Sequence, residues 1–252
     1  MTVQFENTAP VATITIDRPE KLNAMDRETY AALDAAFAAI DEDEGIAAAI
    51  VTGAGGRAFS AGADLKRMHA PDAKRKGWGP WRTDGWSFGR TPATPLIAAI
   101  DGYALAGGLE LALTCDIRIA TPESTFGCPE VRWALLHGLG AVRLPAVVGL
   151  TNAMSMLLTG DSIDAEEALR IGLISRIVPQ EGLMDEARRL AASIAENHAG
   201  AVQMTKELAN RAAYSGQEDV LRLYRSYFAV LESNPEQPEA IGRFGAKQAA
   251  AD

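Results

Sequence analysis

Short apolar segments recur along this chain and constrain its fold more than any other feature. The first spans Val11 to Asp17, and others cover residues 47–52, 96–100 and 117–120. After the first, Asp26 is a suitable N-cap for a helix that carries apolar residues on one face. Strands that alternate with helices in this way predict an α/β fold.

Two glycine-containing turns are candidate binding sites for an anionic group. They lie at residues 58–64 and 102–110, and each is predicted to leave a strand and open a helix, where backbone N–H groups lack helical acceptors. Gly62 tolerates an unusual φ, and the N–H of Gly107 is expected to point out of a helix N-terminus. The free N–H groups of two such turns can together bind one oxygen that becomes negative during a reaction. Taken alone, the first stretch is also typical of a tight turn with a helix cap.

Two glutamates follow the second turn. Glu110 lies inside an otherwise apolar run, where a carboxylate is costly unless it has a function or a partner. A structural hydrogen bond or ion pair is the alternative for this residue. Glu130 follows Pro129, and Pro-Glu by itself is a common helix start. Two carboxyl groups beside paired N–H donors are typical of an enzyme that acts on a polarised carbonyl.

Other site patterns are weak or missing in this sequence. The strand and glycine cluster at residues 50–56 lack the three-glycine spacing of a dinucleotide-binding turn, and neither a phosphate-binding loop nor a serine-nucleophile elbow occurs. The three histidines, His69, His137 and His198, are far apart and lack ligand spacing, so no metal site is predicted. A catalytic base is one interpretation of His137, and a satisfied core or loop histidine is the other.

Bulk properties limit the classes of partner. A formal net charge of -9 argues against nucleic acid, because binding phosphates needs clustered Lys and Arg. Cys115 and Cys128 match no zinc pattern and are expected to be reduced core thiols of a cytoplasmic protein. We expect neither a secretory signal nor membrane insertion, because the sequence has no basic segment followed by an apolar run and no bilayer-length apolar stretch.

The chain is expected to have two regions, a core over residues 1–195 and a helical region over residues 196–252. Residues 67–95 contain four prolines and three tryptophans and predict a long irregular loop, which is either a functional lid or a surface insertion. The aromatic-rich segment at residues 221–231 favours a subunit interface over an internal core, and therefore a homo-oligomer.

The ordered set of motifs resembles the enoyl-CoA hydratase/isomerase family, also called the crotonase family, over nearly the whole chain. The matching segments are Asp17-Arg18-Pro19, Leu22-Asn23-Ala24-Met25, Phe59 to Asp64, Ala98 to Ala104, Cys115 to Ala120, Phe126-Gly127, Pro129-Glu130, Arg143-Leu144, Leu158-Thr159-Gly160 and Glu167-Ala168. Each segment alone is weak evidence for the family, but the ordered set of segments is highly specific for it. The resemblance implies a spiral of ββα units with a helical C-terminal trimerisation region, assembled as a trimer or a dimer of trimers. It also implies an acyl-CoA thioester as substrate and no separate cofactor.

The resemblance also assigns site residues. The backbone N–H groups of Ala61 and Gly107 would form an oxyanion hole for the thioester oxygen. Glu110 and Glu130 match the two glutamates of the hydratases, with Glu130 as the acid for C2 and Glu110 as the base that orients water. The residues expected to contact the coenzyme A substrate are Lys21, Leu22, Ala61, Gly62, Ala63, Asp64, Leu65, Gly107, Phe244 and Lys247.

Together these expectations describe an enoyl-CoA hydratase. Double-bond isomerisation, dehydration of a substituted acyl-CoA and thioester hydrolysis are alternatives on the same scaffold, and a non-catalytic acyl-CoA binder is another. Two segments depart from the family pattern: His137-Gly138 stands where relatives often have Pro-Gly, and the loop with Trp78, Trp81 and Trp86 is this chain's own. Both segments line the acyl end in relatives, so the identity of the acyl group stays open.

Overall fold

The computed structural model describes residues 2–68, 92–214, 223–227 and 230. The chain divides into two compact units, residues 1–196 and 197–252. Both glycine-containing turns and both glutamates lie in the first unit. The expected contacts of Phe244 and Lys247, and most of the predicted loop at residues 67–95, lie outside the described residues.

The first unit contains two β-sheets. The strands are β1 (Val3–Thr8), β2 (Val11–Ile16), β3 (Ala48–Gly53), β4 (Ala58–Ser60), β5 (Leu96–Ile100), β6 (Tyr103–Leu105), β7 (Ile117–Ala120), β8 (Thr125–Gly127), β9 (Ser162–Asp164) and β10 (Arg176–Ile177). The six-stranded sheet has the order β1-β2-β3-β5-β7-β10, and the four-stranded sheet has the order β4-β6-β8-β9. The pairs β1–β2 and β8–β9 are antiparallel, and the other neighbours are parallel.

From β3 to β8, successive strands of the chain alternate between the two sheets. β3 is followed by β4, β5 by β6 and β7 by β8, so each turn of the chain adds one strand to the large sheet and one to the small sheet. This is a spiral of strand pairs. The expected α/β architecture is therefore confirmed.

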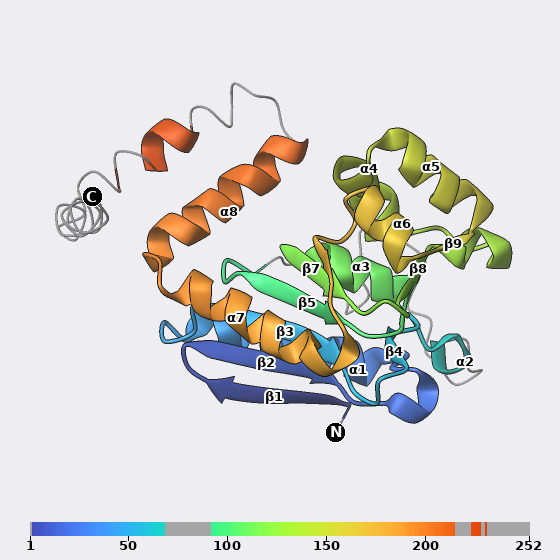
Figure 1. Ribbon diagram of the computed structural model, residues 1–252, viewed down its shortest axis with the longest axis horizontal. Helices are drawn as coiled ribbons and strands as arrows, with labels where there is room; N and C mark the ends of the chain where they lie inside the picture. The colour runs from blue at the N-terminus through green and yellow to red at the C-terminus, as the bar shows by residue number, and fades with distance from the viewer. Residues whose placement is uncertain (1, 69–91, 215–222, 228–229, 231–252) are drawn as a thin grey trace. The chain divides into compact units, whose positions relative to one another are not determined.

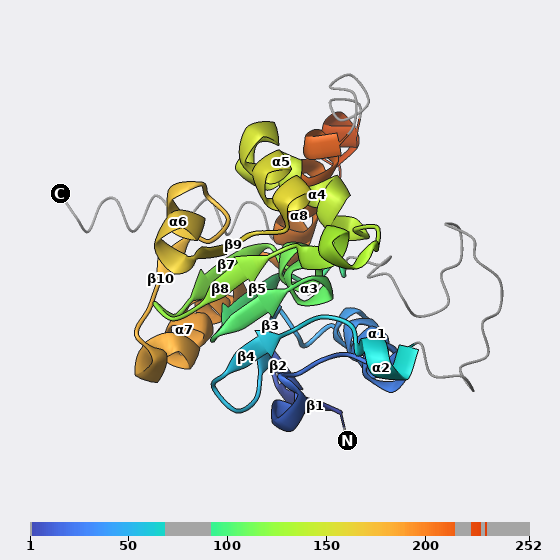
Figure 2. The ribbon, with the colours of Figure 1, turned by 90° about the vertical axis from the view of Figure 1, so that its right-hand side faces the viewer.

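Helices complete the first unit. They are η1 (Pro19–Lys21), α1 (Arg27–Glu42), α2 (Leu65–Met68), α3 (Gly107–Thr114), η2 (Pro129–Trp133), α4 (Leu139–Val148), α5 (Leu150–Thr159), α6 (Ala165–Arg170), η3 (Gln180–Gly182) and α7 (Leu183–Ala195). As predicted, α1 begins after Asp26, whose side chain accepts a hydrogen bond from the N–H of Thr29 at 3.0 Å. In Figure 2, α4 and α5 lie together above the strands, α6 lies at the left, and α1 and α2 lie at the right.

The middle strands of the large sheet are buried on both faces. One face, with Val51 and Ala98, joins the main core, and the other, with Ile50 and Ile97, packs against α7. Figure 1 shows α7 lying along β3 and β5. This double burial explains why the middle strands are continuously apolar instead of alternating.

The second unit contains α8 (Ala199–Tyr214), the long helix of its described part. Cys115 and Cys128 are both buried and form no disulfide, as expected for core thiols. No helix in the described parts of the chain has the length and apolar content needed to cross a bilayer.

Candidate active site

The first glycine turn is held against the segment at residues 22–25 by three backbone hydrogen bonds. Ala61 donates its N–H to the carbonyl of Leu22 at 2.9 Å, and Met25 donates to Gly62 at 2.7 Å. Asp64 then donates to the carbonyl of Met25 at 2.8 Å. The N–H of Ala61 is therefore engaged inside the protein, which corrects the expectation that this group faces a ligand.

Ala63 occupies the position in this turn that faces away from residues 22–25. It forms a parallel β-bridge with Met25. The two hydrogen bonds of this bridge use the carbonyl of Gly62 and the N–H of Asp64, the residues on either side of Ala63. In a parallel ladder the central residue of such a bridge directs its own N–H to the opposite side. No acceptor for the Ala63 N–H is found among the described residues.

The second glycine turn packs directly on the first. A Cβ atom on Gly62, where φ is +89°, would lie 3.0 Å from the backbone nitrogen of Gly107. Ala106, between β6 and α3, has φ 49° and ψ −124°, a conformation that non-glycine residues rarely adopt. Gly107 is the first residue of α3, so its N–H has no helical acceptor. The two turns thus bring the free N–H groups of Ala63 and Gly107 into one small region.

Glu110 projects from the first turn of α3 toward the N-terminus of α4. Its Oε1 accepts a hydrogen bond from the N–H of Gly140 at 3.0 Å, and the N–H of Gly138 also contributes. Burial raises the pKa of Glu110 above its usual value, and the charge of Glu130 raises it further, while these N–H groups oppose the rise. The α4 amides hold the carboxylate at a helix N-terminus, where an anion is favoured.

Glu130 is buried at the start of η2, after Pro129. Its Oε2 lies 3.0 Å from Nδ1 of His137, and that ring is buried too. The other ring nitrogen of His137, Nε2, lies 3.0 Å from the carbonyl of Leu157 on α5. His137 therefore has close polar partners, as the structural interpretation of this residue requires, and one of them is a candidate catalytic carboxyl.

Tyr30 and Cys128 border the two glutamates, and no sequence pattern indicated either of them as a site residue. A Cβ on Gly107 would lie 2.9 Å from the Tyr30 hydroxyl, so this hydroxyl borders the second turn. Burial and the charges of Glu110 and Glu130 raise the pKa values of both the tyrosine hydroxyl and the cysteine thiol. Both groups therefore stay protonated at neutral pH.

Cys128, Glu130 and His137 form a compact buried cluster, with potential ligand atoms within 4.8 Å of one another. Histidine spacing in the sequence did not indicate this cluster, because its other members are a thiol and a carboxyl group. The raised pKa of the Cys128 thiol disfavours the thiolate that a metal would need. We assign no metal here, and the absence of a metal stays a prediction.

The expected coenzyme A segment is organised by a buried guanidinium. Nη2 of Arg18 lies 3.1 Å from the carboxylate of Asp26 and 3.2 Å from that of Asp64. Nζ of Lys21 lies 3.6 Å from the same Asp64 oxygen, and the Lys21 side chain is 44% exposed. Leu65 is exposed at the start of α2. Asp64 is therefore a partner of two cations, which leaves Lys21 and Leu65 as the more accessible groups.

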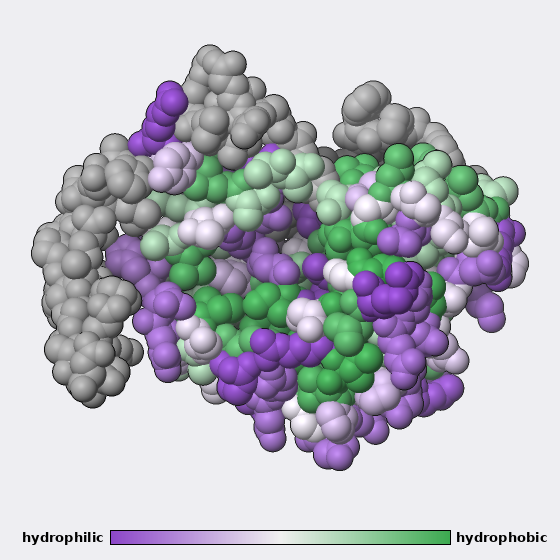
Figure 3. All heavy atoms as spheres, turned by 45° about the horizontal axis from the view of Figure 1, so that its top comes forward, coloured by the Kyte–Doolittle hydropathy of each residue, from purple (hydrophilic) through white to green (hydrophobic). Residues whose placement is uncertain are grey.

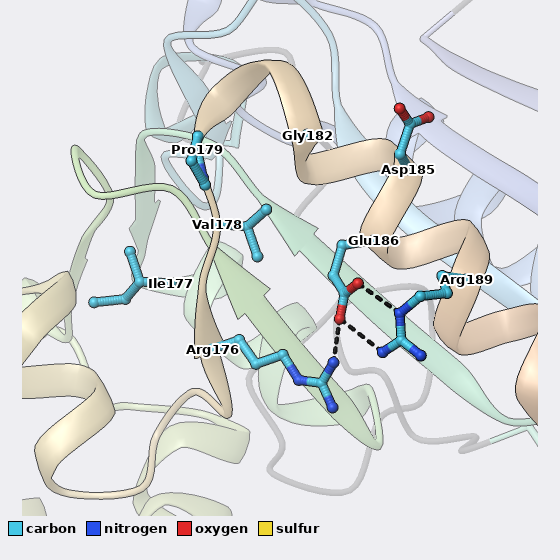
Figure 4. Close-up of a pocket in the computed structure, with 8 residues that line it drawn as sticks. All are labelled: Arg176, Ile177, Val178, Pro179, Gly182, Asp185, Glu186 and Arg189. Carbon is cyan, nitrogen blue, oxygen red and sulfur yellow. Dashed lines mark hydrogen bonds and ion pairs between the residues drawn. The ribbon is translucent and has the colours of Figure 1, made fainter.

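A separate pocket lies between β10 and α7 (Figure 4). Glu186 forms ion pairs there with both Arg176 and Arg189, as the dashed lines show. These pairs engage the two cations of the pocket, and none of its lining residues belongs to the turns or glutamates described above. We therefore place the candidate active site at the two turns.

Comparisons with known proteins identify the family and the relatives of this chain. The family model described as enoyl-CoA hydratase/isomerase matches residues 6–250. The chain is 38% identical to the (E)-benzylidenesuccinyl-CoA hydratase of Thauera aromatica, covering 100% of this chain and 98% of that protein. It is 35% identical to the short-chain-enoyl-CoA hydratase of Clostridium acetobutylicum, over 96% and 94% of the two chains. The crystal structure of an enoyl-CoA hydratase subunit from Geobacillus kaustophilus matches with a TM-score of 0.89 and 35% identity, over 98% of this chain and 96% of that one.

Proposed function

The chain belongs to the enoyl-CoA hydratase/isomerase family, and from that premise we propose that it adds water reversibly across the 2,3 double bond of an enoyl-CoA thioester. The observation that carries the proposal is two glutamates placed beside two turns that each contain one backbone N–H group, of Ala63 or Gly107, without an acceptor among the described residues. Similarity to proteins named as hydratases supports the same reaction.

In the proposed complex, the thioester oxygen accepts hydrogen bonds from the N–H groups of Ala63 and Gly107. The hydrogen bond from Ala61 to Leu22 supports the choice of Ala63 over Ala61. Negative charge builds on this oxygen when water attacks C3, so both donors bind the enolate-like transition state more strongly than the substrate. Loss of one such donor costs about 10²–10³ in rate in other enzymes.

The two glutamates would handle the protons of the added water. Glu110, held by the amides at the start of α4, orients the water and takes one proton as the water oxygen bonds to C3. Glu130 gives one proton to C2, where the electron pair of the enolate forms the new C–H bond. The product is a 3-hydroxyacyl-CoA. Transfer of the proton from Glu110 to Glu130 then restores the starting protonation state of both carboxyl groups. The carboxyl groups influence each other's charge, so they act as a pair.

Coenzyme A enters this scheme as part of the substrate, and we propose no further cofactor. Lys21, Leu22 and Leu65 border the first turn and are the described residues suited to contact it. The assignments of Phe244 and Lys247 remain predictions. The acyl group also stays open, since the two relatives compared above are named for different acyl groups.

Isosteric variants of the glutamates test the proposal. Glu110→Gln and Glu130→Gln should each lower kcat for crotonyl-CoA hydration by about 10²-fold or more, because an amide neither takes nor gives the proton. Binding of a saturated acyl-CoA, measured by calorimetry, should persist in both variants. Glu123→Gln changes an exposed glutamate between β7 and β8 and serves as the control. Hydration near the wild-type rate in either active-site variant would refute the assignment.

Product analysis separates hydration from the other reactions of this scaffold. Supplied with crotonyl-CoA, the wild-type protein should form 3-hydroxybutyryl-CoA. Conversion of a 3-enoyl-CoA to the 2-enoyl isomer without hydration would instead identify an isomerase, and release of free coenzyme A would identify a hydrolase. Binding without turnover across a panel of acyl-CoA thioesters would identify a binding protein.

A crystal structure with a bound acyl-CoA would test the choice of donors. The thioester oxygen should lie within about 3.2 Å of the backbone nitrogens of Ala63 and Gly107. The hydrogen bond from Ala61 to Leu22 should be retained. A thioester oxygen bound to Ala61, with that hydrogen bond broken, would reject our choice and restore the expectation from the sequence.

A further inference from the structure

The contact between His137 and Glu130 is formed by a loop that folds back over η2. The carbonyl of Glu130 accepts the N–H of Leu135 at 3.1 Å, and Ala134 adopts a left-handed conformation with φ 55°. This reversal places the His137 ring against the Glu130 carboxyl group, with Nδ1 3.0 Å from Oε2. The side chains are 6% and 11% exposed, so water has little access to the contact.

The partner of the other ring nitrogen determines the tautomer of His137. Nε2 lies 3.0 Å from the carbonyl of Leu157, and a carbonyl oxygen only accepts hydrogen bonds. Nε2 must therefore carry a proton. In a neutral imidazole Nδ1 is then left with a lone pair, and that lone pair faces Glu130.

This arrangement lacks a proton between the two facing atoms. An ionised Glu130 and a neutral His137 would oppose two lone pairs at 3.0 Å, and neither Nδ1 nor Oε2 has a hydrogen-bond partner among the described residues. Buried polar atoms are rarely left in that state, because each unsatisfied atom costs free energy. One additional proton, on either Nδ1 or Oε2, converts the contact into a hydrogen bond.

We infer that His137 is a positioning residue that shares a proton with Glu130, fixing the orientation of this carboxyl group and coupling its ionisation to that of the imidazole. The inference rests on the proposed function, in which Glu130 delivers the proton to C2. With Oε2 directed at His137, the other carboxyl oxygen is left for the substrate. The proton for C2 is a second one, carried on this other oxygen, and its delivery leaves the Glu130 carboxylate paired with the protonated Nδ1 of His137.

The surroundings of the pair include other titratable groups. Glu110 on α3 interacts electrostatically with His137, whose positive charge favours the ionised form of Glu110. Cys128 lies within 4.8 Å of both members of the pair, and its protonated thiol carries no charge. Glu110 acts on Tyr30 as well, which also stays neutral. The pair therefore sits between one further carboxyl group and two neutral groups.

Two substitutions of His137 separate its two hydrogen bonds. The side-chain amide of Asn reaches the position of Nδ1, so His137→Asn can still donate to Glu130 but loses the Leu157 contact. Gln reaches the position of Nε2, so His137→Gln keeps the Leu157 contact and loses the Glu130 contact. We expect His137→Gln to lower kcat about 10- to 100-fold with KM for crotonyl-CoA changed less than about 3-fold, and His137→Asn to retain more activity.

Further measurements distinguish positioning from simple structural support. His137→Gln should change the shape of the pH profile of kcat, whereas His198→Gln, at an exposed histidine just before α8, should leave profile and rate unchanged. Thermal unfolding checks that each variant is folded. If His137→Asn loses more activity than His137→Gln, or if His137→Gln keeps the wild-type kcat and pH profile, the inference is wrong.

Nitrogen NMR of the imidazole tests the pair without using activity. In ¹⁵N-histidine-labelled protein, Nε2 of His137 should be protonated, and Glu130→Gln should change the Nδ1 signal of His137. An unchanged Nδ1 signal would overturn the pairing. Normal hydration by Glu130→Gln would instead refute the proposed function, so the two failures are distinguishable.

Discussion

At the scale of single residues, opposing influences act on the carboxyl group of Glu110. Burial among apolar neighbours disfavours its charge, and so does the charge of Glu130. The N–H groups of Gly138 and Gly140 act in the opposite direction. Burial is the largest of these effects, so the folded protein holds the Glu110 proton more tightly than the unfolded chain does. The residue is therefore placed for proton exchange at a cost in stability.

That cost predicts a pH-dependent gain in stability for Glu110→Gln. The folded-state pKa lies above the unfolded value of about 4.3, so wild-type stability falls as pH rises from about 4.3 through the folded-state pKa. Gln has no proton to lose and avoids this fall. The variant should have a higher free energy of unfolding than wild type at about pH 8, with the gain disappearing toward about pH 4. Urea unfolding at both pH values measures this, and a gain that grows as pH falls would contradict it.

The closeness of Gly138 to Glu110 gives a second prediction at this scale. A Cβ on Gly138 would lie 3.0 Å from both carboxylate oxygens of Glu110, so Gly138→Ala must displace that carboxylate. We expect kcat to fall about 10-fold or more, since small displacements of catalytic groups are costly. Gly182→Ala is the control, because its Cβ would meet only Val178, at 3.6 Å. Equal activities of the two variants would show that Glu110 tolerates the added atom.

At the scale of elements, one buried guanidinium joins three parts of the site. Arg18, after β2, pairs with Asp26 at the start of α1 and with Asp64 in the first glycine turn, and it donates to the carbonyl of Ala24. Asn23 adds hydrogen bonds to the carbonyls of Ala54 at 2.9 Å and Ala58 at 2.7 Å. These contacts hold the turn at residues 61–64 in its conformation.

Removing this guanidinium should destabilise the fold strongly. Arg18→Met leaves two buried carboxylates without their main cation, and breaking such a buried pair costs about 3–5 kcal/mol. Arg132→Met is the matched control, because Arg132 and its partner Asp161 are exposed and such pairs contribute about 1 kcal/mol or less. Chemical denaturation measures both differences. A loss for Arg18→Met no larger than for Arg132→Met would show that the cluster does not hold the turn.

The strands also differ in how well their sequences predict them. The middle strands of the large sheet were predicted to within one residue at each end, because burial on both faces makes them continuously apolar. β1 was not predicted, because it is an edge strand in which only Val3 is buried and its apolar alternation is limited to Val3 and Phe5. The strands of the small sheet have three residues each, too few to show any period.

At the scale of the whole molecule, the first unit keeps an apolar surface over α4 and α5. Figure 3 shows green spheres gathered at the upper right, over these helices. Leu150 is 65% exposed and Leu158 is 66% exposed, and Leu136, before α4, is 86% exposed. Large exposed apolar surfaces of soluble proteins commonly mark sites of association. This surface adds to the sequence-based expectation of a homo-oligomer.

The mass of the protein in solution tests the prediction that it forms a homo-oligomer. The chain has a mass of 26.8 kDa, and the expected trimer or dimer of trimers should elute with three or six times that value in light-scattering chromatography. Association is favoured because it removes apolar surface from water, at about 25 cal/mol per Å². A single-chain mass over a range of concentrations would contradict the prediction.

The sequence by itself determined the middle strands of the large sheet, the helix that follows Asp26, the two glycine turns and the pair of glutamates. These follow from local patterns: apolar periodicity, capping residues, and carboxyl groups inside apolar runs. Only the tertiary structure decided which N–H group of the first turn is free, because that depends on which residues of the distant segment 22–25 pair with it. It likewise placed His137 against Glu130, because the loop reversal and the Leu157 carbonyl come from separate parts of the chain. Hydrogen bonds between distant segments carry no periodic signal in a sequence, so these details require the folded protein.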